Sequence, residues 1–450
     1  MTTRRTLVVV GGDAAGMSAA SQARRRDAAL EIIVYERGEH VSYVACGMPY
    51  LVGGLVSGPE RLIARRPDQF RQQNIQVHTH HEVVSIDTGN RRVEVAPADG
   101  EPFVQTYDEL LIATGARAAY PDIPGVHAEG VFGLRSLASG AALWSFVESE
   151  RPERAVIVGG GYIGLEVAEA LRLRGIETAL VHRGAEVMSN LDPDMGALAS
   201  QALRDIGVTV YVGEAPHVLV TAGRRVSGVQ LSAGVLPTDM VVLGTGALPN
   251  SELAGAAGIP LGFQGSVRVD GTMRTAVPGV WAAGDCAETV HRVTGRPYWV
   301  ALGTVANKMG RIAGLNLTGG DVTFPGVLGT AITKVGATEI ARTGLNEREC
   351  TGAGLDYIAM HIQDHTLPRY YPGSSEIHVK LCAEKGTGRL LGGQIIGGPG
   401  SGKRIDTVAA CLTAGLTVQD LVDMDLAYAP PFSPVWDPVQ TAARVLLSEV

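Results

Sequence analysis

The sequence predicts an α/β protein in which two Rossmann-like dinucleotide-binding domains precede a C-terminal α+β domain. The first observation is a repeat, because residues 7–12 (Leu-Val-Val-Val-Gly-Gly) return as residues 155–160 (Ala-Val-Ile-Val-Gly-Gly). Each copy leads into an alanine- and arginine-rich helical stretch and then an apolar strand, which is the βαβ pattern of a parallel sheet. The second observation is that the glycine pattern stops after about residue 324. Strand-like stretches over 331–335, 377–382 and 390–396 and a helix over 404–414 predict a separate domain there.

Length and composition limit the classes of protein that fit this chain. Its 450 residues exceed one small core, so two or three domains are expected. A net charge of −8 argues against nucleic acid as a partner, and the lack of a long apolar run argues against a membrane span. The five scattered cysteines show neither a disulfide framework nor a metal-ligand spacing, which favours a reducing cytoplasm and no bound metal.

The first unit predicts a dinucleotide site. A strand over 7–10 runs into a glycine loop, a helix is expected over 17–26, and a strand over 31–36 ends on an acid. Glycines let the amides at a helix start approach a diphosphate, and an acid about 20 residues later suits a ribose hydroxyl. Asp13 departs from the strict pattern because it stands where the second glycine is expected. The predicted contacts come from Gly11, Gly12, Ala15, Gly16, Glu36 and Arg37.

The second unit matches the glycine pattern in full and predicts a nicotinamide nucleotide site, with a helix over 165–174 and a strand over 177–182. Alignment of the two units places His182, followed by Arg183, where the first unit has Glu36. A carboxylate there would repel the 2′-phosphate of NADPH, whereas a His-Arg pair attracts it. NADPH is therefore favoured over NADH, although the pair equally fits a solvated strand end. The loop residues predicted to contact the nucleotide are Gly159, Gly161, Ile163 and Gly164.

Further turns mark the domain edges. Strands are expected to end at Thr114-Gly115 and at Thr245-Gly246, and an apolar strand before residue 284 ends at Gly284-Asp285. Asp285 suits a ribityl or ribose hydroxyl, and together with the two glycine units it predicts FAD. The other turn residues assigned to cofactor binding are Thr114, Gly115, Gly246 and Gly284. The predicted domains are an FAD domain over 1–117 and 249–323, an NAD(P)H domain over 118–248, and a C-terminal domain over 324–450.

Cys46 is the candidate redox residue, since it follows the first dinucleotide unit in the stretch Ser-Tyr-Val-Ala-Cys-Gly-Met-Pro-Tyr. Disulfide reductases with this organisation use two cysteines close in sequence. The other four cysteines, none of them near Cys46 in sequence, have no assigned role: Cys286, Cys350, Cys382 and Cys411. The redox partner of Cys46 is therefore not expected to be another cysteine of the protein.

These motifs resemble the pyridine nucleotide–disulfide oxidoreductases, in particular the single-cysteine branch of coenzyme A-disulfide reductases and NADH oxidases. The resemblance runs from residue 4 to about 445 and is most specific at 42–50, 159–169, 284–285, 306–311 and 425–432. It implies a glutathione-reductase-like fold, with an FAD domain interrupted by an NAD(P)H domain and a C-terminal domain that forms a homodimer.

The resemblance also implies roles for individual residues. Cys46 becomes a nucleophile whose pKa is lowered near the flavin and a helix N-terminus, and it forms a mixed disulfide with coenzyme A or, in the oxidases, a sulfenic acid. Tyr162 covers the flavin until NAD(P)H displaces it, and Glu166 lies close to the nicotinamide. Tyr370 (or its neighbour Tyr371) and Tyr428 reach the active site of the partner subunit, where a phenol protonates the leaving thiolate. The residues implied for the coenzyme A moiety are Ser18, Gln22, Arg25 and Ser42.

The favoured function is NAD(P)H-dependent reduction of coenzyme A disulfide, or of a related small disulfide or polysulfide, through Cys46. An NAD(P)H oxidase that reduces oxygen stays open, although Ala14 replaces a histidine of the peroxidase-type relatives. Ala45 departs from the Asn that often precedes the cysteine in the reductases and from the Ser of some oxidases, and this leaves the acceptor open. The alternative from another class is a reductase of a ferredoxin-like protein, and a redox sensor without turnover also fits the two nucleotide motifs.

Overall fold

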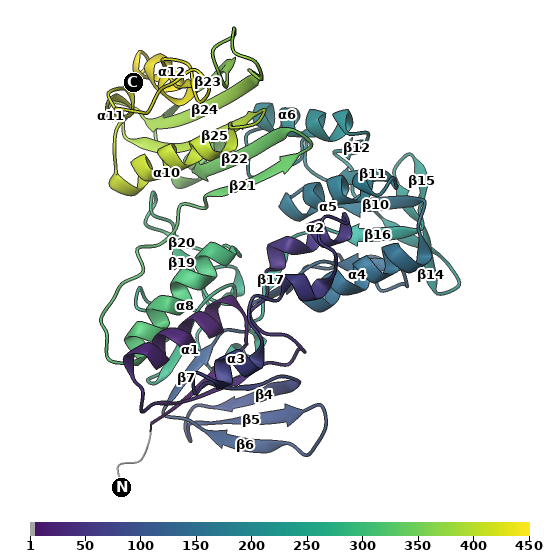
Figure 1. Cartoon of the computed structure of the whole chain (residues 1–450), viewed down its shortest axis with the longest axis vertical. Coiled ribbons are helices and arrows are strands. Elements are labelled where there is room, and N and C mark those ends of the chain that lie inside the picture. The colour runs from purple at the N-terminus through teal and green to yellow at the C-terminus, as the bar shows by residue number, and fades with distance from the viewer. Residues whose placement is uncertain (1–4) are drawn as a thin grey trace.

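The computed structural model describes residues 5–450 as an elongated molecule with three sheet-centred parts (Figure 1). The first part is built on a five-stranded sheet of order β18-β7-β1-β2-β3, in which every pair of neighbours is parallel. Its strands are β1 (Thr6–Val10), β2 (Glu31–Tyr35), β3 (Gln76–His78), β7 (Glu109–Ile112) and β18 (Val280–Ala282). Strands 170 residues apart in the sequence thus pair in one sheet, and β7 lies between β1 and β18.

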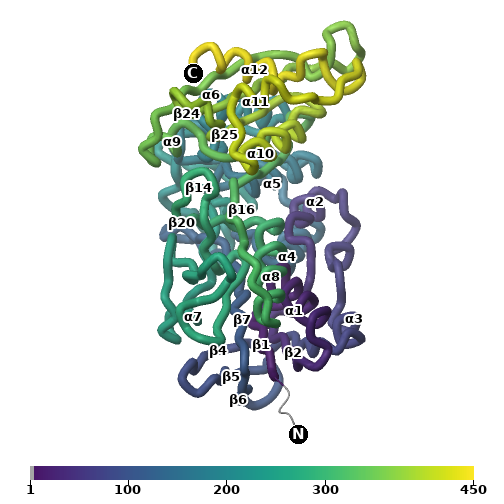
Figure 2. Tube along the Cα trace, turned by 90° about the vertical axis from the view of Figure 1, so that its left-hand side faces the viewer, coloured from purple at the N-terminus to yellow at the C-terminus, as the bar shows by residue number. Residues whose placement is uncertain are grey.

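Two helices lie side by side next to this sheet, as both views show (Figures 1 and 2). They are α1 (Ala14–Arg26) and α8 (Gly303–Leu317). Small residues allow the close approach, because a Cβ added at Gly310 would lie 2.2 Å from the carbonyl oxygen of Ala15. An antiparallel sheet flanks this part, made of β4 (His81–Asp87), β5 (Arg92–Pro97) and β6 (Phe103–Thr106).

The second part repeats the architecture on a five-stranded parallel sheet of order β12-β11-β10-β16-β9. Its strands are β9 (Val131–Gly133), β10 (Arg154–Val158), β11 (Glu177–His182), β12 (Thr209–Val212) and β16 (Met240–Leu243). Its helices are α4 (Leu137–Glu150), α5 (Tyr162–Leu173) and α6 (Pro193–Asp205), and its antiparallel layer is β13 (Val218–Ala222), β14 (Arg225–Leu231) and β15 (Gly234–Pro237). The chain enters and leaves this part through β8 (Ala116–Ala118) and β17 (Ala247–Pro249), which pair with each other. The predicted domain limits themselves stay a prediction.

The third part is an antiparallel sheet of order β21-β22-β25-β24-β23 with helices packed on it. The strands are β21 (Ala331–Val335), β22 (Thr338–Gly344), β23 (Tyr357–His365), β24 (Glu376–Glu384) and β25 (Leu390–Gly397). The helices are α9 (Glu347–Ala353), α10 (Ile405–Ala414), α11 (Val418–Val422) and α12 (Pro438–Leu447). The shorter elements include α2 (Met48–Val52), α3 (Pro67–Arg71), α7 (Glu252–Ala256), β19 (Thr289–Val290) and β20 (Pro297–Tyr298).

The observed bounds of the strands agree with the sequence-based predictions more closely than the observed helix starts do. The predicted strands at 177–182 and 331–335 are found without a shift. Both helices after the glycine loops begin three residues earlier than predicted, at Ala14 and Tyr162. The reason is that each helix starts directly at its glycine loop, where the free amides of the first turn face the predicted diphosphate position. Among residues 5–450, no helix is both long and apolar enough to cross a membrane.

Candidate active site

The first glycine loop is closed by backbone contacts that only glycine permits. A Cβ on Gly16 would lie 2.0 Å from the carbonyl oxygen of Gly11, and one on Gly11 would lie 2.2 Å from that of Ala113. Gly11 also has a φ of 110°, in the region that favours glycine. The Glu36 carboxylate braces the loop by accepting hydrogen bonds from the N–H groups of Gly12 (2.8 Å) and Gly38 (2.7 Å). The structure therefore brings the predicted glycines and Glu36 together at the carboxyl end of β1.

Asp285 lies at the same site, after β18. Its carboxylate pairs with Arg135, while its Oδ1 is buried and has no hydrogen-bond partner among residues 5–450. Burial raises the pKa of Asp285, and Arg135 opposes that shift. The preceding Gly284 (φ 83°) has no room for a side chain, because a Cβ would lie 2.7 Å from that of Ala15 at the start of α1. A buried acceptor without a partner is the group that a ligand hydroxyl would satisfy.

Asp13 gives the first loop a titrating acid. Its Oδ1 accepts the N–H of Tyr43 at 3.2 Å, so it ties the glycine loop to the loop that precedes Cys46. Burial raises the pKa of Asp13 to about 6, and the charges of Glu36 and Asp285 act in the same direction. The departure from the glycine pattern thus places an ionisable side chain where the α1 amides would meet a diphosphate.

The second glycine loop copies the first with a different side chain. Gly164 approaches Gly159 as Gly16 approaches Gly11, with a Cβ-to-oxygen distance of 2.0 Å. His182 takes the place of Glu36, because its Nδ1 accepts the N–H of Gly160 at 3.1 Å. An accepting Nδ1 requires the neutral ring with its proton on Nε2, which lies 2.8 Å from the Ser189 hydroxyl.

His182 therefore does not supply the charge that the sequence prediction gave it. Burial and the neighbouring Arg183 lower its pKa, in agreement with a neutral ring. The cation of the predicted phosphate-binding pair is the exposed Arg183 alone. Glu36 and His182 occupy equivalent positions, since each accepts the N–H of the second glycine of its loop.

Tyr162 and Glu166 lie on the first turns of α5, which faces the Cys46 region. The Tyr162 hydroxyl accepts a hydrogen bond from the Asn190 side chain at 3.1 Å. Glu166 accepts the hydroxyl of Thr333 from β21 at 2.9 Å, and burial raises its pKa. These two residues thus lie where the second and third parts of the molecule meet.

Cys46 lies in a short 3₁₀ turn, Ala45–Gly47, directly before α2, and is the exposed cysteine of the five. Burial raises the pKa of the Cys46 thiol, the Glu166 charge adds to this, and Arg135 opposes it, so the protein groups around the thiol do not supply the predicted lowering. The part of that prediction that depends on a nearby flavin stays a prediction. Helix α2 has only five residues, so the effect of its amides is small. The other four cysteines are fully buried, and the Cys286 thiol donates to the carbonyls of Ile112 (3.4 Å) and Ala283 (3.5 Å).

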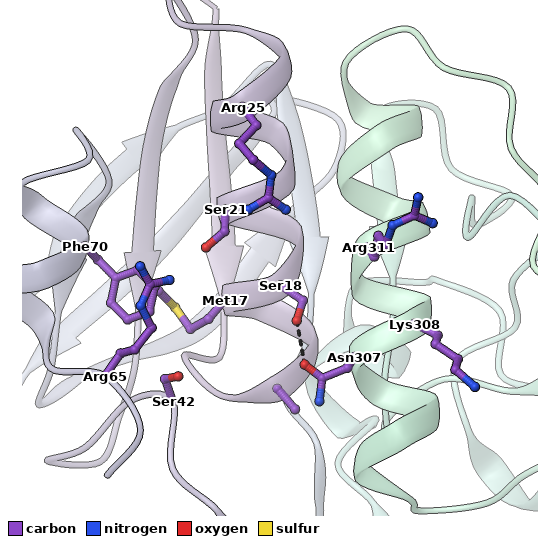
Figure 3. Close-up of a pocket in the computed structure, with 11 residues that line it drawn as sticks. Met17, Ser18, Ser21, Arg25, Ser42, Arg65, Phe70, Asn307, Lys308 and Arg311 are labelled. Carbon is purple, nitrogen blue, oxygen red and sulfur yellow. Dashed lines mark hydrogen bonds between the residues drawn. The ribbon is translucent and has the colours of Figure 1, made fainter.

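A cavity of about 470 Å³ lies between α1, α8 and the segment that leads to Cys46 (Figure 3). It brings together three of the four residues predicted for coenzyme A, namely Ser18, Arg25 and Ser42. Gln22 does not line it but accepts a hydrogen bond from Arg25 at 2.8 Å. Sequence reasoning did not assign the remaining lining residues to this ligand: Ala14, Met17, Ser21, Arg65, Phe70, Asn307, Lys308 and Arg311.

The cavity is basic, since Arg25, Arg65, Lys308 and Arg311 all line it. Within residues 5–450, none of these four side chains forms an ion pair with a carboxylate. Arg65 instead lies over the Phe70 ring, 4.6 Å from its centroid. The sequence could have indicated the two cations of α8, Lys308 and Arg311, because positions three residues apart share one helix face.

Ser42 connects this cavity to the cysteine loop. Its N–H donates to the carbonyl of Gly12 (2.9 Å), and its own carbonyl accepts from the N–H groups of Ala64 (2.8 Å) and Arg65 (3.2 Å). Its φ of 49° turns the chain sharply at this point. The loop from Ser42 to Cys46 therefore begins at the basic cavity and ends at the exposed thiol.

Comparison with known proteins agrees with this arrangement. Residues 5–310 match the family described as pyridine nucleotide-disulphide oxidoreductase, and residues 330–438 match its dimerisation domain. The chain belongs to the pyridine nucleotide-disulphide oxidoreductase family.

Two relatives and one solved structure represent the similarity. The chain is 41% identical to an NAD(P)H coenzyme A polysulfide/persulfide reductase of Pyrococcus horikoshii, over 98% of each chain. It is 30% identical to a coenzyme A disulfide reductase of Staphylococcus haemolyticus, over 95% of this chain and 96% of the relative. The structure of an NAD-dependent persulfide reductase from A. fulgidus has a TM-score of 0.95 and 40% identity over 99% of this chain and 83% of that one.

The remaining predicted residues of this oxidoreductase lie either at the two chain crossings between the first and second parts of the molecule or on its surface. Thr114 and Gly115 fix a chain crossing, because the Thr114 hydroxyl donates to the Asn250 carbonyl at 2.6 Å and the Asn250 N–H donates to Gly115 at 3.0 Å. Gly246 lies at the other crossing with a φ of 108°. Tyr370 and Tyr428 lie on loops of the C-terminal part with 75% and 47% of their surface exposed. Their ligand and catalytic roles stay predictions, as does the role of the exposed Arg37, which pairs with Glu82 at 3.8 Å.

Proposed function

We propose that this oxidoreductase uses NAD(P)H to reduce a sulfur–sulfur bond attached to coenzyme A, as in coenzyme A disulfide or a coenzyme A persulfide, through Cys46. The observation that carries the proposal is the basic cavity lined by Ser42, the first residue of the loop that leads to the exposed Cys46. A cavity of this volume is within the range of small-molecule sites, and its unpaired cations suit a ligand with several phosphates. The relatives that are named for coenzyme A-linked sulfur substrates support the same class of substrate.

FAD fits the first glycine loop. The buried Asp285 Oδ1 without a partner suits a ribityl or ribose hydroxyl, and the Gly11–Gly16 turn leaves the α1 amides open to a diphosphate. Glu36 lies at the position for an adenosine ribose. When bound, FAD would supply the carrier that takes a hydride from the nicotinamide and returns an electron pair to sulfur.

The second loop is proposed to bind NADPH or NADH. Gly159, Gly161 and Gly164 open the start of α5 to the diphosphate, and a neutral His182 braces the loop without repelling a 2′-phosphate. The exposed Arg183 is then the residue that attracts the extra phosphate of NADPH. In this proposal the nicotinamide displaces Tyr162.

The reaction at sulfur balances with one nicotinamide for each disulfide. The Cys46 thiolate attacks coenzyme A disulfide, forms a sulfur–sulfur bond to one coenzyme A and expels the other as a thiolate. Two electrons from NADPH then cleave this mixed disulfide to the Cys46 thiolate and a second coenzyme A thiolate. The sum is NADPH, H⁺ and coenzyme A disulfide giving NADP⁺ and two coenzyme A thiols. Arg135 favours the Cys46 thiolate, whereas Glu166 opposes it.

The partner subunit is proposed to complete the site. The family's dimerisation domain is present, and the exposed Tyr370 and Tyr428 are available to a second copy. A phenol that donates its proton to the departing coenzyme A thiolate would act as a general acid. Tyr428→Phe should then slow the disulfide step and leave reduction by NADPH unchanged.

The deciding experiment is anaerobic NADPH and NADH oxidation by the purified protein with coenzyme A disulfide or coenzyme A persulfide. Turnover that Cys46→Ser abolishes is the expected result, and the two nicotinamides settle the cofactor preference. Turnover that occurs only in air, without any disulfide, would replace the proposal with an oxidase. Full activity of Cys46→Ser toward a ferredoxin-like protein would instead identify a protein reductase.

A further inference from the structure

The segment of residues 188–192, between β11 and α6, contacts the second glycine loop, the end of β11 and the start of α5. The Met188 N–H donates to the carbonyl of Gly160 at 2.7 Å. The Ser189 hydroxyl is 2.8 Å from His182 Nε2, and the Asn190 side chain donates to the Tyr162 hydroxyl at 3.1 Å. Residues 189 and 190 thus form hydrogen bonds with His182, which is predicted near the 2′-position of the nucleotide, and with Tyr162, which is predicted at its nicotinamide end.

The other side of this segment is held by the C-terminal domain. The carbonyl of Asn190 accepts hydrogen bonds from the Arg342 guanidinium and from the Asn346 side chain (3.1 Å). Arg348 donates to the carbonyl of Ser189 at 2.7 Å. Asp192 accepts the N–H of Glu347 at 3.0 Å and exchanges two hydrogen bonds with the Gln394 amide, of 2.7 and 2.6 Å.

These contacts are well fixed. Arg342 is only 4% exposed and its charge is satisfied by Glu349 at 2.7 Å, so its position is determined by a buried ion pair. Met188 is buried and has a φ of 54°, a backbone conformation that surrounding contacts must hold in place. The segment therefore has little freedom to adjust on its own.

We propose that Asn190 is a positioning residue for Tyr162, and that Arg342 transmits the state of the C-terminal domain to the nicotinamide site through the 188–192 segment. The inference rests on the proposed function in one respect, the displacement of Tyr162 by the nicotinamide. That displacement breaks the Asn190–Tyr162 hydrogen bond, so the bond opposes nucleotide binding. Because Arg342 and Asn346 fix the Asn190 backbone, a shift of β22 or α9 would loosen the bond and open the nicotinamide site.

The test compares nicotinamide affinity in variants of the FAD-containing protein. Removing one hydrogen bond should tighten NADP⁺ binding about 5-fold, equivalent to about 1 kcal/mol, as measured by titration calorimetry. Asn190→Ala and Tyr162→Phe should each give this gain, and the double variant should give no more than either alone. Gln201→Ala is the matched control, since this exposed residue of α6 bonds only to Asp205 (2.7 Å).

Hydrogen–deuterium exchange tests the link to the C-terminal domain. Arg342→Lys keeps the charge of the buried pair but loses the two-pronged geometry, so the 188–192 amides and the start of α5 should exchange faster. The same variant should shift NADP⁺ affinity in the direction of Asn190→Ala. Wild-type exchange and wild-type affinity in Arg342→Lys would overturn the link.

Three outcomes of the affinity experiment would overturn the role of Asn190. They are an Asn190→Ala affinity equal to that of Gln201→Ala, a weakened affinity, and effects of Asn190→Ala and Tyr162→Phe that add. A protein that binds NADP⁺ with the expected pattern but reduces no coenzyme A disulfide would support this inference and refute the proposed substrate. A wild-type protein that binds no nicotinamide nucleotide would refute both.

Discussion

The substitution Asp13→Asn is expected to stabilise the protein at neutral pH and to have little effect in acid. The folded protein raises the pKa of Asp13 from 3.8 to about 6, chiefly through burial. The native state therefore binds more protons than the unfolded chain between about pH 4 and pH 6, and its stability falls as the pH rises through that window. The shift of about 2 units corresponds to about 3 kcal/mol above pH 6, at about 1.4 kcal/mol per unit.

Asparagine removes this penalty and keeps an oxygen that can accept the N–H of Tyr43. The assay is the first thermal unfolding transition across pH 4–8, because a chain with several sheet-centred parts does not unfold in one step. The variant should unfold roughly 6–12 °C above the wild type at pH 8 and at nearly the same temperature at pH 4. Asp99→Asn, which changes an exposed carboxylate of the same part, should show no such pH-dependent gain. A gain that is equal at both pH values, or a loss at pH 8, would refute the assigned environment of Asp13.

Three further predictions concern the Cys46 thiol, the second glycine loop and the basic cavity. Glu166→Gln should lower the pKa of Cys46, because it removes a nearby negative charge; iodoacetamide should then alkylate the thiol faster at pH 7, and an unchanged rate would contradict the assigned coupling. Gly164→Ala should destabilise the fold by about 1–3 kcal/mol, because the added methyl group overlaps Gly159. Gly161→Ala has open space at its Cβ, so this variant should fold normally and only weaken nucleotide binding. Equal stabilities of the two variants in denaturation would count against the loop geometry. Arg311→Ala should raise the KM for coenzyme A disulfide roughly 5-fold and leave the KM for NADPH unchanged, and steady-state kinetics that move both would argue against the cavity as the coenzyme A site.

The sequence by itself predicted the local chemistry of the glycine loops. The alignment of His182 with Glu36 holds in the structure, because both side chains accept the N–H of the second loop glycine. Such equivalence is readable because a βαβ unit fixes the spacing between its glycines and the end of its second strand. The charge state of His182 could not be predicted from the sequence, since it depends on burial and on the Gly160 N–H that its Nδ1 accepts in the folded chain.

The tertiary structure decided what lies around these local motifs. The thiol of Cys46 was predicted from one short stretch, but the raised pKa of that thiol comes from burial and from Glu166, which is 120 residues away in the sequence. The cavity joins α1 to α8, whose residues are nearly 300 positions apart, and Arg342 reaches Asn190 from another domain. Local spacing and composition determine helices, strands and glycine turns, whereas burial, charge coupling and interdomain hydrogen bonds depend on which distant elements pack together. The packing of distant elements therefore decides which of the predicted motifs lie together at one site.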